Sequence, residues 1–118
     1  MSDKKFIDFQ TLEGVLVGRV LVHTLSEYES GVVFADISAT AAPAAPNPRI
    51  VLNCEEVEMI ASAGIGMFIN LQRQCKDNGG AFAAFGLNKD IVNVLRLTRV
   101  DRVFTLAESQ EEAITAVK

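Results

Sequence analysis

The sequence predicts a single α/β domain in which helices pack mainly on one face of a β-sheet. Short apolar, β-branched runs alternate along the chain with longer segments whose apolar residues recur at helical spacing. Within residues 49–85 a strand, a helix and a second strand follow one another, an order that implies a parallel strand pair joined by a right-handed crossover. At 118 residues the chain is long enough for one core and too short for two.

Composition and charge argue against several classes of protein. With 49% hydrophobic and 22% charged residues, the chain resembles ordinary soluble globular domains rather than disordered chains. A net charge of -4 with dispersed basic residues argues against nucleic acid as a partner. No stretch approaches the ~18 uninterrupted apolar residues needed to cross a bilayer, and the polar N-terminus lacks the apolar core of a signal peptide. We therefore expect a cytoplasmic protein with no direct membrane insertion.

The residues that most often carry chemistry are few. Cys54 and Cys75 are not in metal-type or Cys-x-x-Cys spacing, so two buried thiols in a reducing compartment are expected rather than a disulfide or a zinc site. His23, the sole histidine, ends a predicted strand without the positioned partners that acid–base catalysis needs. The acidic run at 55–58 is expected to be solvated surface, because no second acidic cluster accompanies it. The sequence predicts no catalytic residue, no metal and no cofactor, and hence no enzyme.

The N-terminal part of the chain is expected to hold two strands and a helix. The strands are predicted at 6–9 and 15–22. Ser26 and Glu29 form a Ser-x-x-Glu capping box, which predicts a helix that begins there and ends near residue 38. Because β-branched residues disfavour helices, a strand over 32–37 is the alternative.

The remaining elements are predicted to alternate. All three prolines lie within 39–48, which is therefore expected to be a surface loop. The predicted elements that follow are a central strand at 49–54, a helix at 63–77, a strand at 81–85, a helix capped by Asn88 or a near neighbour, a strand at 103–106, and a final helix that opens with the Ser109–Glu112 capping box. The expected core residues of the last two helices are Ile91, Val94, Leu95, Ala113, Ile114 and Val117.

The stretch 60–66, Ile-Ala-Ser-Ala-Gly-Ile-Gly, is the candidate functional site. A small-residue turn between a strand and a helix leaves backbone N–H groups free at the helix start. The hydroxyl of Ser62 is placed there either to cap the helix or to carry a phosphate. Besides these two roles of Ser62, a further hypothesis is that the turn binds an anion or a nucleotide through the N–H groups of residues 63–66. Gly64 and Gly66 support it only weakly, because close packing of a helix on a sheet also requires small residues.

The run 50–66 resembles the signature of the STAS domain family, the sulfate-transporter and anti-sigma-factor-antagonist domain. In that signature a hydrophobic strand and an acidic turn lead into Asp-Ser-Ser-Gly-Leu-Gly. Ser62 matches the first serine, and residues 64–66 match Gly-Leu-Gly. Ala61 stands in place of the aspartate and Ala63 in place of the second serine. The resemblance continues through the short segments 78–80, 94–98, 103–104 and 109–113.

The resemblance implies a STAS-like single domain over residues 1–118, with a mixed β-sheet and helices packed mainly on one face. It further implies a small cytoplasmic bacterial phosphoprotein that regulates transcription, similar to anti-sigma factor antagonists, which act by partner switching. In such proteins the dephosphorylated form binds an anti-sigma factor serine kinase. Phosphorylation of the serine that matches Ser62 ends this binding, and a serine phosphatase restores it. The resemblance also allows a homodimer.

The implied partner-binding residues are Ala61, Ser62, Ala63, Gly64 and Met67, with Ser62 as the phosphorylation site. A phosphate adds roughly -1.5 to -2 charges. The helix start tolerates this charge because free N–H groups and the helix dipole favour anions, whereas a partner packed on the same turn would meet a desolvated dianion. Since the aspartate and the second serine of the signature are missing, an alternative remains: a non-phosphorylated STAS adaptor or scaffold subunit of a signalling or membrane-transport complex.

Overall fold

The computed structural model describes residues 5–41 and 47–118. Its main sheet has five strands in the order β1-β2-β4-β6-β7. These strands are β1 (Ile7–Leu12), β2 (Val15–Val20), β4 (Arg49–Asn53), β6 (Ala81–Phe85) and β7 (Thr105–Ala107). The β1–β2 pair is antiparallel and the other three pairs are parallel. The sheet is therefore mixed, and β4 is its central strand, as the sequence predicts.

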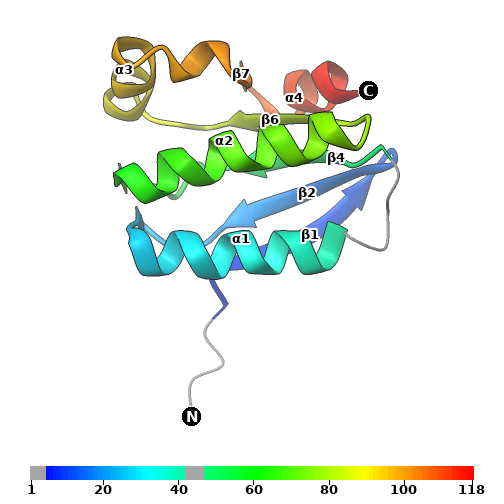
Figure 1. The fold of residues 1–118 in the computed structure, drawn as a ribbon, viewed down its shortest axis with the longest axis horizontal. Helices are drawn as coiled ribbons and strands as arrows, with labels where there is room; N and C mark the ends of the chain where they lie inside the picture. Colours follow the sequence, from blue (N-terminus) through cyan, green and yellow to red (C-terminus); the bar gives the residue numbers. More distant parts are fainter. Residues whose placement is uncertain (1–4, 42–46) are drawn as a thin grey trace.

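Helices cover the two faces of this sheet unequally (Figure 1). The helices are α1 (Glu27–Ala41), α2 (Ser62–Asp77), α3 (Lys89–Leu97) and α4 (Gln110–Val117), with a short 3-10 helix, η2 (Val100–Arg102). Side chains of α1, α2 and α3 share one core with Ile50 and Leu52 of β4, whereas α4 packs on the other face against Val51. Alternate residues of a strand point to opposite faces, so this one strand contributes to both cores. The predicted arrangement, with helices mainly on one face, is confirmed.

Three phenylalanines fix α2 against the β6–β7 side of the sheet. Phe68 of α2, Phe82 of β6 and Phe104, just before β7, form one cluster. The Phe104 ring centroid lies 5.3 Å from each of the other two, and those two are 6.2 Å apart. Such tilted aromatic contacts add to the stabilisation from burial alone. The position of α2 therefore depends on packing along its buried face.

Several predicted elements are confirmed. The segment after Ser26 is a helix rather than the alternative strand, and the Ser26 hydroxyl donates to the Glu29 carboxylate. The strand predicted at 81–85 has the observed bounds of β6. Asn88 caps α3, with its Oδ1 accepting from the Ile91 N–H at 2.9 Å. Ser109 caps α4, with its Oγ accepting from the Glu112 N–H at 3.1 Å.

Other expectations are corrected. Helix α1 continues to Ala41, so residues 39–41 of the predicted loop are helical, and residues 42–46 of that loop lie outside the described residues. The strand predicted at 103–106 is β7, which begins only at Thr105, because the chain before it forms η2 and buries Phe104. Val94 is 41% exposed rather than a core residue, since α3 contributes only Ile91 and Leu95 to the core.

A second, two-stranded sheet was not predicted. Its strands are β3 (Thr24–Leu25) and β5 (Met59–Ile60), which pair in parallel. Each strand has only two residues, too few to produce a periodic hydrophobic pattern in the sequence. The pairing brings the segment before α1 beside the segment before α2, and so defines the surface on which the candidate site lies.

Candidate functional site

The candidate site is the start of α2. Ala61 is the N-cap residue, with an extended backbone (φ -93°, ψ 174°), and its side chain makes no capping hydrogen bond. Ser62 is the first residue inside the helix. The prediction that Ser62 caps α2 is therefore wrong, because a capping residue must precede the helix and α2 begins one residue too early for that. Within the described residues, the Ser62 hydroxyl makes no capping hydrogen bond.

Only some of the predicted site residues reach the surface. Ala61 and Ser62 are exposed and Ala63 is half-buried, whereas Gly64 is buried and Met67 is only 3% exposed. The structure therefore brings the first three together as an accessible turn. The side chain of Met67 belongs to the core.

Backbone donors at this turn are partly used. The N–H groups of Gly64 and Ile65 donate to the Ala61 carbonyl at 2.9 and 3.2 Å, as expected within a first helical turn. Within residues 5–41 and 47–118, the N–H groups of Ser62 and Ala63 have no backbone or side-chain acceptor. Free N–H groups at a helix start attract anions. Two such donors therefore flank the Ser62 hydroxyl.

Gly64 has a steric reason to be glycine. A Cβ at this position would lie 2.5 Å from Cγ1 of Ile60 and 3.0 Å from the carbonyl oxygen of Leu25. Gly66 is different, because a Cβ there would meet nothing within 4 Å. The first glycine of the motif thus allows α2 to pack closely on the β3–β5 ladder, which accounts for it without a bound anion.

A groove between α1 and α2 begins beside this turn. Its walls include Glu27 and Phe34 from α1 and Ala63 and Gly66 from α2, with Met67 also in its lining. Met59, three residues before Ser62, is 66% exposed. Exposed methionine and shallow apolar grooves are typical of protein-binding surfaces, because methionine adapts to partners of varied shape. We call the surface of Met59, Ala61, Ser62 and Ala63, together with this groove, the Ser62 surface.

The acidic run near the site does not form a metal-type cluster. In the described part of the chain, no group of three or more His, Cys, Asp or Glu residues is placed to hold a metal ion. Glu56 pairs with Arg19 across the surface, and Glu58 lies 3.3 Å from Nδ1 of His23. The single histidine thus lies in the segment between β2 and β3, beside a surface carboxylate.

Both cysteines are free and buried, as predicted. Burial in apolar surroundings raises the pKa of the Cys54 thiol from 9.0 to about 12, and that of Cys75 to about 11. A thiol with such a pKa stays protonated near neutral pH and is a poor nucleophile. Neither cysteine therefore contributes reactive chemistry to the site.

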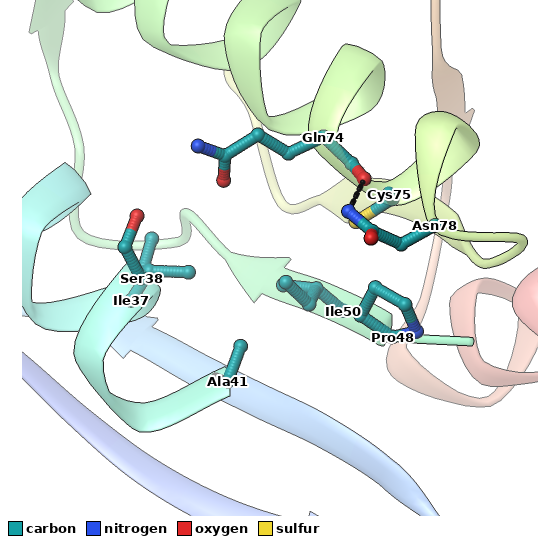
Figure 2. Close-up of a pocket in the computed structure, with 8 residues that line it drawn as sticks. All are labelled: Ile37, Ser38, Ala41, Pro48, Ile50, Gln74, Cys75 and Asn78. Atoms are coloured by element: carbon teal, nitrogen blue, oxygen red, sulfur yellow. Dashed lines mark hydrogen bonds between the residues drawn. The ribbon is translucent and has the colours of Figure 1, made fainter. Parts of the chain in front are cut away.

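A cavity of about 310 Å³ lies at the opposite end of α2, between the last turns of α1 and α2 and the start of β4 (Figure 2). The described residues that line it are Ile37, Ser38, Ala41, Pro48, Ile50, Gln74, Cys75 and Asn78. Figure 2 shows the Asn78 side-chain amide, which donates to the Gln74 carbonyl at 2.7 Å. This hydrogen bond caps the C-terminal end of α2. None of these eight side chains carries a charge at neutral pH. They supply no general acid, general base or activated nucleophile.

No helix in residues 5–41 or 47–118 combines the length and the hydrophobicity needed to cross a membrane.

Comparisons with known proteins agree with the motif. The STAS domain model matches residues 24–113. A Thermotoga maritima protein named as an anti-sigma factor antagonist is 31% identical over 70 residues, which cover 59% of this chain. The match spans 62% of the length of that curated relative.

Solved structures share the fold over nearly the whole chain. An anti-sigma-factor antagonist (STAS) domain protein from Planctomyces limnophilus has a TM-score of 0.83 at 24% identity, covering 93% of this chain and 96% of its own. The Bacillus anti-sigma factor antagonist SpoIIAA has been solved unphosphorylated, with a TM-score of 0.68 at 17% identity, and phosphorylated, with a TM-score of 0.67 at 20% identity. The two forms cover 93% of this chain each, and 94% and 97% of their own. With its motif, its sheet order and its family match in agreement, the chain belongs to the STAS domain family.

Proposed function

We propose that the protein is an anti-sigma factor antagonist that binds an anti-sigma factor serine kinase through the Ser62 surface and is released when Ser62 is phosphorylated. The observation that carries this proposal is the exposed Ser62 hydroxyl at the start of α2, at the position that matches the first serine of the STAS signature. SpoIIAA, which shares this fold, has been solved in both phosphorylated and unphosphorylated forms.

The surroundings of Ser62 suit a reversible charge switch. A phosphate on its Oγ would lie beside the two free N–H groups, those of Ser62 and Ala63, at the positive end of the α2 dipole. The domain would therefore keep its fold when phosphorylated. A kinase packed on Met59 and Ala61 would instead face roughly two negative charges in a contact that excludes water. Phosphorylation thus weakens the complex without unfolding the antagonist, and a serine phosphatase would restore binding.

Ala61, which replaces the aspartate of the STAS signature, is compatible with this mechanism. Because Ala61 has no side-chain oxygen, it neither caps the helix nor occupies the first N–H groups of α2. An aspartate there would add a negative charge next to the phosphate. Its replacement by alanine leaves the donors free and removes that repulsion. The kinase must then recognise the turn through its backbone and its apolar side chains.

The test combines phosphorylation with binding. The protein is incubated with its cognate kinase and MgATP, and the peptide that holds Ser62 is analysed by mass spectrometry. Calorimetry then compares kinase binding by the wild type, Ser62→Ala and Ser62→Asp. We expect phosphate on Ser62, binding without phosphorylation for Ser62→Ala, and binding weakened at least about 10-fold for Ser62→Asp, the order expected for a charge buried without a partner.

Ser109→Asp is the matched control, because it adds the same charge at a helix start on the other face of the sheet. Aspartate also caps helices well, so this variant should keep both its stability and its affinity for the kinase. Absence of phosphate on Ser62 would contradict the switch. A partner complex that Ser62→Asp leaves unchanged would instead favour the adaptor hypothesis.

A further inference from the structure

A second surface, rich in basic side chains, lies towards the C-terminal end of α2. The outer face of α2 and the turn at η2 line an open groove, to which Ile69, Arg73, Lys76, Asp77, Arg102 and Val103 contribute. We call this the α2–η2 groove. Residues 69–103 carry six basic and three acidic side chains, a net charge of +3, although the whole chain has a net charge of -4. The groove lining itself has three basic side chains and one acidic side chain, so positive charge predominates there.

The three cations of the groove are available to a partner. Arg73, Lys76 and Arg102 are all exposed. No carboxylate of the described residues lies within 4.0 Å of any of them, whereas Lys5 and Lys118 each have an acidic neighbour at that distance. Asp77 lies in the same lining but forms no ion pair with these cations. The groove thus presents several unneutralised donors on one surface.

Apolar side chains lie among these charges. Val103 is 40% exposed in the groove, and Ile69 is partly buried beside it. Leu97, at the end of α3, is 84% exposed, and α3 packs against η2. Protein interfaces commonly combine arginine with an apolar centre, and exposed apolar side chains grouped with polar neighbours mark binding surfaces.

The pattern of charge favours a protein partner over other polyanions. Arginine, with its planar fork of donors, binds carboxylates in a bidentate way, and two of the three cations are arginines. Asp77 and Asp101 lie among the basic residues, where they would repel a continuous phosphate backbone or an anionic membrane surface. A peptide segment can place its carboxylates selectively and insert an apolar side chain between them.

We propose that the α2–η2 groove binds an acidic segment of a partner protein that presents carboxylates on both sides of an apolar side chain. The carboxylates pair with Arg73 and Arg102, and the apolar side chain contacts Val103. Along α2, Arg73 lies eleven residues from Ser62, about 16 Å at the rise of an α-helix. The groove shares no lining residue with the Ser62 surface.

The probe for this surface is a synthetic amphipathic peptide with glutamates flanking a central leucine, labelled with a fluorophore. Controls are the same peptide with lysine for glutamate and with serine for leucine. Binding is measured by fluorescence anisotropy and mapped by amide chemical shifts. We expect shifts centred on Arg73, Lys76 and Arg102, affinity that decreases with added salt, and loss of binding by both control peptides.

Substitutions in the protein identify the contacts. We expect Arg73→Glu/Arg102→Glu to weaken peptide binding about 10-fold or more, and Val103→Ser to weaken it to a smaller extent. Arg49→Glu changes an exposed arginine outside the groove and should leave the affinity unchanged. The far-ultraviolet circular dichroism of every variant is compared with the wild type, because a folded variant is needed for each comparison.

Three results would overturn the proposal. The first is an absence of shifts at the groove, and the second is an equal loss of affinity in Arg49→Glu. The third is tighter binding of duplex DNA or of phosphatidylserine vesicles that the Arg73→Glu/Arg102→Glu variant abolishes, which would assign the groove to phosphate-bearing partners instead.

Discussion

Helix α2 begins in a different way from α3 and α4. In α3 and α4 a side chain caps the first turn, Asn88 in one and Ser109 in the other. Helix α2 follows Ala61 and has no side-chain cap. It is instead held along its length by buried residues such as Phe68 and Leu71. A helix anchored by its core face can leave its first turn to a partner or a phosphate, whereas in α3 and α4 a side chain already accepts from one N–H of the first turn.

The largest expected effect tests whether packing holds α2. Replacing Phe68 by alanine should lower the free energy of unfolding by about 3 to 5 kcal/mol, because a fully buried ring is lost from the three-phenylalanine cluster and leaves a cavity. Urea denaturation measures the change. A loss below about 1 kcal/mol would contradict the comparison, since α2 would then depend on something other than its core face.

Alkaline pH should weaken the same core. The folded protein keeps Cys54 and Cys75 protonated up to pKa values of about 12 and about 11, whereas unfolded thiols ionise near 9.0. Stability from each thiol is therefore full below pH 9.0 and is lost as the pH rises towards the folded-state pKa, by at most about 1.4 kcal/mol per pH unit for each thiol. Urea denaturation between pH 8 and 11 measures this slope. In Cys54→Ala/Cys75→Ala the slope should be smaller, and an unchanged slope would assign the loss to other groups.

Removal of the side-chain cap should destabilise α3, whereas α2 has no such cap to remove. Asn88→Ala should cost about 1 kcal/mol or more, because the Ile91 N–H loses its acceptor and the Glu58 carbonyl loses the Asn88 side-chain donor. Thermal unfolding followed by circular dichroism detects the change. Asn93→Ala, on the exposed side of the same helix, is the control and should not destabilise the protein. Equal destabilisation by both variants would show that the cap has no special role.

Addition of a cap should make α2 resemble its neighbours. Ala61→Asp places an acceptor at the N-cap and a negative charge near the helix dipole, so we expect a gain of about 0.5 to 1 kcal/mol. Urea denaturation compares the variant with Ala61→Leu, which offers no acceptor. A destabilised Ala61→Asp would mean that the first N–H groups are not available to a side chain.

The smallest expected effect is that of Ser62→Ala. Since Ser62 lies inside the helix and does not cap it, its removal should change the free energy of unfolding by no more than about 0.5 kcal/mol. The same denaturation experiment measures it. A loss near 1 kcal/mol or more would show that the hydroxyl stabilises the fold, and would weaken its assignment as a free phosphate acceptor.

Most of the fold could be predicted because its signals are local. The bounds of β6 follow from one short apolar run, and the caps at Asn88 and Ser109 follow from side chains that accept hydrogen bonds three residues on. What was missed depends on tertiary contacts. The β3–β5 ladder is too short to be periodic, and the exposure of Val94 depends on how far α3 extends beyond the core.

The candidate site was located by its motif, but its details were not. If α2 began one residue later, Ser62 would be its N-cap residue, but Ser62 is instead the first residue inside the helix. Helix boundaries are not defined by sequence to that accuracy. The resemblance places Met67 among the partner-binding residues, yet its side chain is buried in the core that α1 and α2 share. The α2–η2 groove was missed because its cations come from segments far apart in the chain.

The β3–β5 ladder has a consequence for how the Ser62 surface responds to a partner. Thr24 pairs with Met59 and Leu25 with Ile60, and the Ala61 N–H donates to the Leu25 carbonyl at 2.9 Å. Main-chain hydrogen bonds therefore join the chain segments that lead into α1 and α2. A partner that restrains one turn also restrains the other, and slowed hydrogen exchange at the Ala61 amide would report on both helix starts.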